Sequence, residues 1–155
     1  MSLESVRAFL AVKAPDIAII ELADSSATVA QAAAGHGVTH AQIAKTLSLR
    51  VGERNLLVVT RGDARLDNRK AKAAFGGKAR MLSAEEVPVI TGHPVGGVSP
   101  FGLPEGLAVY CDVSLKAFDE VVPAAGSTHS ALRISPTRMA ELAGATWVDV
   151  CQMAE

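Results

Sequence analysis

Residues 91–103 are the part of this sequence best suited to chemistry. Their sequence, TGHPVGGVSPFGL, holds four glycines and two prolines. Glycine allows a ligand to approach the main chain closely, and proline stiffens the loop. Successive exposed N–H groups in such a loop form a cradle for a phosphate or for the oxyanion of a carbonyl under attack. The alternative interpretation is an ordinary surface loop, because glycine and proline are typical of loops in general.

Few side chains are candidates for reactive groups beside this loop. Lys45 precedes Thr46 and Leu47, so it either lies along the surface or carries its charge into a pocket. Ser99 lies in the loop without a GxSxG motif, and we interpret it as a hydroxyl that bonds main chain or substrate. The histidines lack zinc-ligand spacing and are interpreted as surface or loop residues: His36, His40, His93 and His129. We therefore expect neither a metal nor a cofactor.

Length and composition indicate one domain with a sizeable core. The chain has 155 residues, of which 49% are hydrophobic and 4% aromatic, so the core is expected to consist of aliphatic side chains. No apolar run is long enough to span a membrane, and the N-terminus lacks a signal-peptide pattern. We expect a cytoplasmic protein in which Cys111 and Cys151 are buried thiols.

Basic residues are concentrated in one part of the chain. Residues 61–80 hold seven basic side chains against two aspartates, although the whole chain has a net charge of −1. Such a stretch is either a solvated helix face with its flanking loop or a surface for a phosphate backbone. The latter interpretation predicts nucleic acid contacts at Arg65, Arg69, Lys70 and Lys72.

The elements that must position these groups are short helices and strands. Helices are expected at 3–13, from a Thr28 cap to Gly35 or Gly37, at 68–75 after an Asp67 cap, briefly after Ser83, and from Ser135 to Gly144. Strands are expected at 17–22, 46–51, 56–61, 79–82, 107–111, 121–122, 131–134 and 147–150. Lys45 then lies between a short helical turn and a strand. The pattern predicts an α+β fold in one domain, with a mixed, largely antiparallel and partly barrel-like sheet surrounded by short helices.

Four segments together carry a resemblance to a known family. They are TVAQAAAGHGVTHAQIAKTLSLRV (28–51), LLVVTRGDARLDNRKAKAAFG (56–76), TGHPVGGVSPFGLP (91–104) and VYCD (109–112). In this order and spacing the chain resembles the YbaK and prolyl-tRNA-synthetase-associated editing domains. The resemblance covers nearly the whole chain, and it implies a free-standing deacylase that hydrolyses mischarged aminoacyl-tRNA. It implies tRNA-Pro as partner, with prolyl-tRNA synthetase as a further one, and neither DNA nor membrane.

The resemblance also assigns residues to the site. Its key lysine falls on Lys45, which with Gly97 and Ser99 forms the expected catalytic set. Further substrate-binding residues are expected in the same region: Thr46, Gly96, Pro100, Asp112 and His129. An aminoacyl ester is already activated, so positioning, oxyanion donors and a water or ribose hydroxyl as nucleophile suffice.

One departure from the family bears on the substrate. Cysteine-selective members place a serine and an acid in the region that aligns with residues 123–132, where this chain has Ala124, Ala125 and Ala131, with His129 nearby. Alanine, serine, threonine or a small non-protein amino acid is therefore the expected substrate rather than cysteine. Two alternatives remain open at this stage: a non-catalytic module that binds tRNA or a synthetase, and a hydrolase that uses Ser99 and Lys45.

Overall fold

Side-chain caps and glycines fix the ends of the helices, much as the sequence predicts. The computed structural model describes residues 2–153. Thr28, Asp67 and Ser135 each accept a main-chain N–H in the first turn of their helix, and Gly37 and Gly76 adopt left-handed conformations beyond the last turn. The helices are α1 Ser2–Lys13, α2 Val29–His36, α3 Asn68–Phe75, α4 Glu86–Thr91 and α5 Pro136–Ala143, with 3-10 turns η1 His40–Gln42 and η2 Val113–Ala117.

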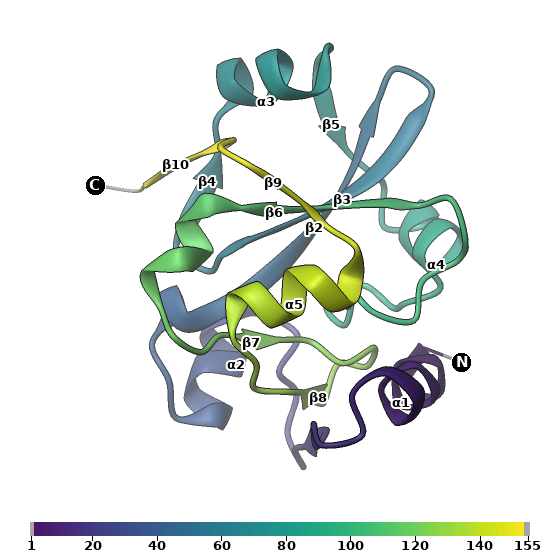
Figure 1. Cartoon of the computed structure of the whole chain (residues 1–155), viewed down its shortest axis with the longest axis vertical. Helices are drawn as coiled ribbons and strands as arrows, with labels where there is room; N and C mark the ends of the chain where they lie inside the picture. The colour runs from purple at the N-terminus through teal and green to yellow at the C-terminus, as the bar shows by residue number, and fades with distance from the viewer. Residues whose placement is uncertain (1, 154–155) are drawn as a thin grey trace.

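A mixed sheet forms the centre of the molecule (Figure 1). The strands are β1 Ile20–Glu21, β2 Ile43–Val51, β3 Arg54–Arg61, β4 Ala64–Leu66, β5 Ala79–Met81, β6 Ala108–Asp112, β7 Val122–Pro123, β8 Ser130–Ala131, β9 Thr146–Val148 and β10 Cys151–Met153. The main sheet has the order β5-β2-β3-β6-β9, and β7 pairs with the start of β2. Two further pairs, β1 with β8 and β4 with β10, are antiparallel. The predicted α+β fold is confirmed.

The main sheet is open among the described residues. The β2–β3 hairpin and the β2–β5 pair are antiparallel, whereas β3–β6, β6–β9 and β2–β7 are parallel. The edge strands β5 and β9 have three residues each and do not pair with one another. The partial, barrel-like closure expected from the sequence is therefore not formed.

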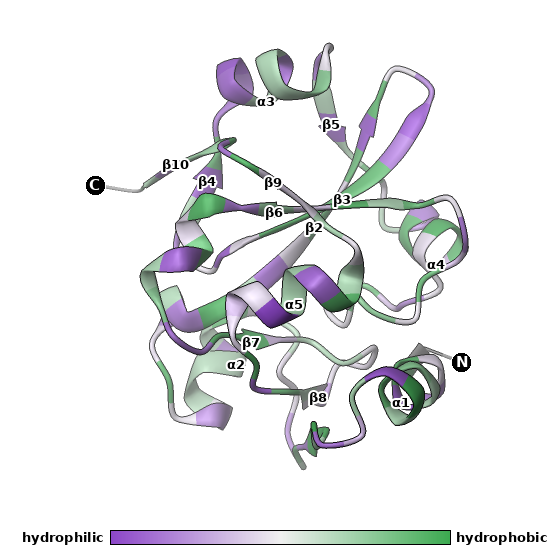
Figure 2. Cartoon of the chain, in the orientation of Figure 1, coloured by the Kyte–Doolittle hydropathy of each residue, from purple (hydrophilic) through white to green (hydrophobic). Residues whose placement is uncertain are grey.

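Alternate residues of the strands supply two apolar cores on opposite faces of the sheet. Leu57 and Val59 of β3 contribute to the core covered by α1 and α5, whereas Leu56 and Val58 contribute to the core covered by α3 and the β4–β10 pair. Figure 2 shows hydrophobic residues along β3 and hydrophilic residues at the outer end of the β2–β3 hairpin. The sheet is therefore buried on both faces in its middle.

Long-range pairing changes the predicted strand bounds at several places. β2 begins at Ile43, because Ile43 and Ala44 pair with Val122 and Pro123, so Lys45 lies inside a strand and not at a junction. The strand expected at 17–22 is reduced to β1, since its partner β8 has only two residues.

No helix within residues 2–153 has the length and apolar character that crossing a membrane requires.

Candidate active site

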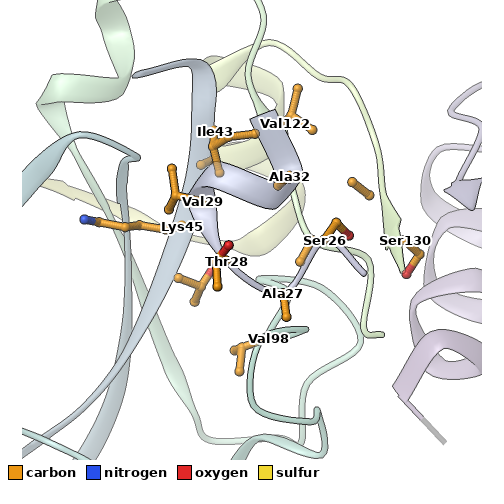
Figure 3. A pocket seen from close by; sticks show the side chains of 15 residues that line it. Ser26, Ala27, Thr28, Val29, Ala32, Ile43, Lys45, Val98, Val122 and Ser130 are labelled. Carbon is orange, nitrogen blue, oxygen red and sulfur yellow. The ribbon is translucent and has the colours of Figure 1, made fainter. Parts of the chain in front are cut away.

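A cavity of about 120 Å³ lies where the start of β2 meets α2 and the glycine-rich loop of residues 92–103, called the glycine loop below. Its walls are residues 26–29 and Ala32 from the α2 region, residues 43–46 of β2, Gly96 and Val98 of the loop, Val122 and Ala124 around β7, and Ser130 and Ala131 of β8. Figure 3 shows side chains from these separate segments converging on one space. Apart from one lysine, the described lining residues are small, aliphatic or hydroxyl-bearing. The cavity therefore suits a small, mainly apolar group.

The first turn of α2 is held firmly at the edge of this cavity. The Thr28 hydroxyl accepts a hydrogen bond from the Gln31 N–H at 3.1 Å, and the Gln31 side chain accepts one from the Thr28 N–H at 3.3 Å. This reciprocal capping box fixes the direction in which the chain enters the helix. The first main-chain N–H groups of a helix have no partner within the helix. The end of α2 thus offers donors beside the cavity at Val29.

Lys45 lines the cavity, but its ammonium group leads away from it. Nζ donates a hydrogen bond to the Ala64 carbonyl oxygen of β4 at 2.5 Å, and Figure 3 shows the side chain pointing away from Thr28 and Val29. Burial lowers the pKa of Lys45, an effect opposed by the nearby Cys151 and Asp63. Lys45 is the ionisable side chain among the described lining residues. Its charge therefore lies at the wall, between the cavity and β4.

Among the hydroxyl groups of the described lining residues, that of Thr46 has no hydrogen-bond partner. Consecutive strand residues point to opposite faces of a sheet, so Thr46 and Lys45 diverge. Within the described residues, the buried Thr46 Oγ1 has no hydrogen-bond partner. The other lining hydroxyls are engaged: Ser26 with the Thr128 carbonyl at 3.2 Å, Ser130 with Ser127 at 2.6 Å, and Thr28 in its cap. An unpaired buried hydroxyl is costly, and a bound polar group would satisfy it.

The glycine loop contributes to the cavity through Gly96 and Val98. Gly97 does not line it, and the Gly97 N–H donates to the Pro94 carbonyl at 2.9 Å. The Gly97 Cα lies against the main chain of Ser127, since a Cβ there would be 2.6 Å from the Ser127 carbonyl carbon. Gly97 therefore seats the loop against the segment before β8.

The other residues expected at the site lie outside the lining. Ser99 and Pro100 are buried, and the Ser99 hydroxyl accepts from the Phe101 N–H at 3.3 Å. Asp112 is buried and accepts from the Val150 and Ser114 N–H groups at 2.8 and 3.0 Å, which ties η2 to the C-terminal strands. His129 is exposed, with Nδ1 2.9 Å from the Thr128 hydroxyl. The structure thus brings together Lys45, Thr46 and Gly96.

The predicted basic surface lies on α3 and β4. Arg65, Arg69, Lys70 and Lys72 are all exposed. Lys70 pairs with Asp149 at 3.1 Å, and this hydrogen bond raises the pKa of Lys70. Figure 1 shows α3 at the opposite end of the molecule from α2 and β8. The cavity lies at the start of β2, whereas Phe75 at the end of α3 packs in one cluster with Leu49 and Val51 toward the other end of that strand.

Two histidines depart from the sequence interpretation. His93 lies in a loop, one of the expected places, but it is fully buried, and His36 lies at the end of α2 and is 8% exposed. Burial lowers the pKa of each. Of the alanines that the sequence comparison with the family singled out, Ala124 and Ala131 line the cavity and Ala125 does not. Sequence reasoning missed the α2 wall, because nothing in the sequence brings residues 26–29 beside Ser130.

Comparison with known proteins finds relatives that match most of this chain. A sequence model of the aminoacyl-tRNA editing domain matches residues 23–142. Protein YwhH of Bacillus subtilis is 47% identical over 154 residues, which cover 98% of each chain. The proline–tRNA ligase of Bacillus licheniformis is 31% identical over 102 residues, which cover 65% of this chain and 18% of the ligase. The chain therefore corresponds to a small part of that ligase.

Solved structures agree with these sequence relatives. A crystal structure described as a "putative trans-editing enzyme for prolyl tRNA synthetase" superposes with a TM-score of 0.89 at 32% identity, covering 97% of each chain. The hypothetical protein APE2540 also has a TM-score of 0.89 at 32% identity, covering 96% of this chain and 99% of its own. The resemblance seen in the sequence thus extends to the whole fold.

Proposed function

The chain belongs to the aminoacyl-tRNA editing domain family, and we propose that it is a trans-editing hydrolase that removes a small, wrongly attached amino acid from tRNA-Pro. The observation that carries this proposal is the 120 Å³ cavity with its unpaired Thr46 hydroxyl, located where Lys45, Thr46 and Gly96 meet. The likeness to a part of prolyl-tRNA ligase and to a structure described as a trans-editing enzyme for its synthetase supports tRNA-Pro as the substrate.

The proposed reaction needs positioning more than a reactive side chain. Water adds to the ester carbonyl, the proton is transferred to the leaving ribose oxygen, and the amino acid separates from the tRNA. Main-chain N–H groups at the α2 terminus and the loop stabilise the developing oxyanion. The Gly97 N–H is not among these donors, because it already donates a hydrogen bond to the Pro94 carbonyl. The proposed reaction uses no serine nucleophile, since Ser99 is buried and does not line the cavity.

Cavity size supports alanine, serine and threonine over larger amino acids. Val29, Ile43 and Val122 limit the space with branched side chains, and alanines form much of the rest. In an apolar pocket, one methylene group changes the binding free energy by only about 1–3 kcal/mol. We therefore expect proline to be excluded because its ring does not fit between the cavity walls. Thr46 Oγ1 adds one polar contact, which suits the amino group or a side-chain hydroxyl of the substrate.

The deciding experiment is a single-turnover deacylation panel. The purified protein is mixed with tRNA-Pro that carries alanine, serine, threonine, cysteine or proline, and release of the labelled amino acid is followed. We expect faster release of alanine, serine or threonine than of cysteine, no release of proline above the spontaneous rate, and no change with a chelator. Binding without release of any amino acid would instead indicate the non-catalytic tRNA-binding module.

Charge reversal on α3 tests whether the basic surface holds the tRNA. The double variant Arg69→Glu, Lys72→Glu should weaken tRNA binding and reduce the slope of log affinity against log salt by up to about one unit for each lost phosphate contact. Turnover at saturating tRNA should be unchanged, because neither Arg69 nor Lys72 lines the cavity. Lys13→Glu is the matched control, since Lys13 is an exposed lysine of α1. An unchanged slope in the double variant would mean that the surface is merely solvated.

A further inference from the structure

His93 is buried at the base of the glycine loop, where it joins the two ends of that loop. Its Nε2 lies 2.9 Å from the Phe101 carbonyl oxygen, eight residues along the chain. Its main-chain N–H donates to the Thr91 hydroxyl at 3.0 Å, and that hydroxyl donates to the Val87 carbonyl of α4 at 2.7 Å. One end of the loop is thus anchored to α4, and the imidazole connects this end to the other.

The partner of the imidazole determines its tautomer. A carbonyl oxygen only accepts hydrogen bonds, so Nε2 carries a proton in this bond. Nδ1 is buried and has no partner within the described residues. A second proton there would place an unpaired charge in a buried site, in line with the lowered pKa of His93. The ring therefore acts as a fixed, neutral hydrogen-bond donor.

Both ends of this bond are packed rigidly, whereas the loop between them reaches the cavity. Phe101 is 1% exposed and stacks on Phe9 of α1, with 5.7 Å between ring centroids. Between His93 and Phe101, Gly96 and Val98 line the cavity. Gly96 leaves no room for a side chain, since a Cβ would be 2.7 Å from the Ala27 Cβ. A shift of the loop would therefore move one wall of the cavity against α2.

We infer that His93 is a positioning residue that holds Gly96 and Val98 in place and thereby sets the size of amino acid the cavity admits. This inference rests on the proposed function for its consequence in catalysis, and on the loop geometry alone for its structural part. The imidazole does not line the cavity, so it acts through the loop. Loss of its donor frees the Phe101 carbonyl and lets the loop wall open.

Two variants separate the hydrogen bond from the bulk of the side chain. In His93→Leu, an apolar side chain fills the volume of the imidazole but the hydrogen-bond donor is lost. His93→Gln retains an N–H donor near the position of Nε2. We expect His93→Leu to slow deacylation of alanyl-tRNA-Pro about tenfold and to reduce the ratio of alanine to proline release, because a displaced wall misplaces the ester. His93→Gln should restore most of the rate and of the ratio.

Amide hydrogen exchange supplies a readout that does not depend on catalysis. Peptides covering residues 94–101 should exchange faster in His93→Leu than in the parent, and His93→Gln should restore protection, while peptides from β2 and β3 stay unchanged in all three proteins. Parental exchange and parental selectivity in folded His93→Leu would overturn the inference. Faster loop exchange, in a protein whose parent releases no amino acid, would retain the positioning role and reject the proposed function instead.

Discussion

Ala131→Leu should slow release of alanine from tRNA-Pro by about a hundredfold or more, the largest effect we expect from a single side chain. Ala131 is 3% exposed and packs with Ala32, Ile43 and Val122. The larger side chain has little room except in the 120 Å³ cavity, where it takes the place of the substrate's own side chain. Displacing a reacting group by about 1 Å already costs roughly a hundredfold in rate.

The measurement is single-turnover deacylation, with circular dichroism and thermal unfolding to verify the fold. Ala34→Leu is the matched control, because Ala34 lies on α2 but is exposed, so it adds the same side chain without filling the cavity. The control should deacylate at the parental rate. If folded Ala131→Leu does so too, the amino acid binds elsewhere.

Lys45→Met is expected to reduce tRNA affinity and deacylation rate by about ten- to a hundredfold, because a hydrogen bond to a charged group contributes about 1.5–3 kcal/mol. The methionine side chain keeps an unbranched apolar stem at the cavity wall, so the comparison isolates the charge. In the unliganded protein the ammonium binds the Ala64 carbonyl, and its flexible stem allows it to turn toward a phosphate of the tRNA end. Lys45→Arg should recover only part of the loss, since a planar fork replaces a compact charge.

The pH dependence of binding tests the same residue. Burial lowers the pKa of Lys45, so its positive charge is lost, as pH rises, earlier than that of an ordinary lysine. In the parent protein, the affinity for tRNA that carries no amino acid should therefore fall as the pH is raised into the alkaline range. That part of the profile should be absent in Lys45→Met, whose affinity is already low. Parental affinity and rate in folded Lys45→Met would show that the charge plays no part.

Local signals account for what the sequence predicts well. The helix ends follow from side-chain caps at Thr28, Asp67 and Ser135, each of which needs only residues within one turn. The β2–β3 hairpin likewise depends on a short connection between two apolar runs. Long-range pairs escape such signals. β4 and β10 were not predicted, because each has three residues and gains its partner from some 85 positions away.

The candidate site likewise has residues that the sequence predicts and features that depend on long-range contacts. Lys45 and the glycine loop with Gly96 were singled out from the local sequence, Thr46 was assigned by the family resemblance, and all three residues line the cavity. The direction of the Lys45 ammonium was not predictable, because it depends on Ala64 in a strand that the sequence did not indicate. The engagement of the Gly97 N–H with Pro94 depends on the folded turn of the loop. The buried state of His93 depends on packing against Phe101 and α4.

The contact between Gly97 and Ser127 limits how this protein can evolve. Where a glycine faces a side chain, a second substitution can make room: a Cβ on Gly35 would meet the Leu22 Cδ1 at 2.6 Å, so a smaller residue at position 22 would act as a suppressor. At Gly97 the obstacle is main chain, since the three nearest atoms are the carbonyl carbon, carbonyl oxygen and Cα of Ser127. Every residue type has these atoms. A side-chain replacement at position 127 therefore offers no suppressor for a larger residue at position 97, and a lineage that needs this loop has to keep the glycine.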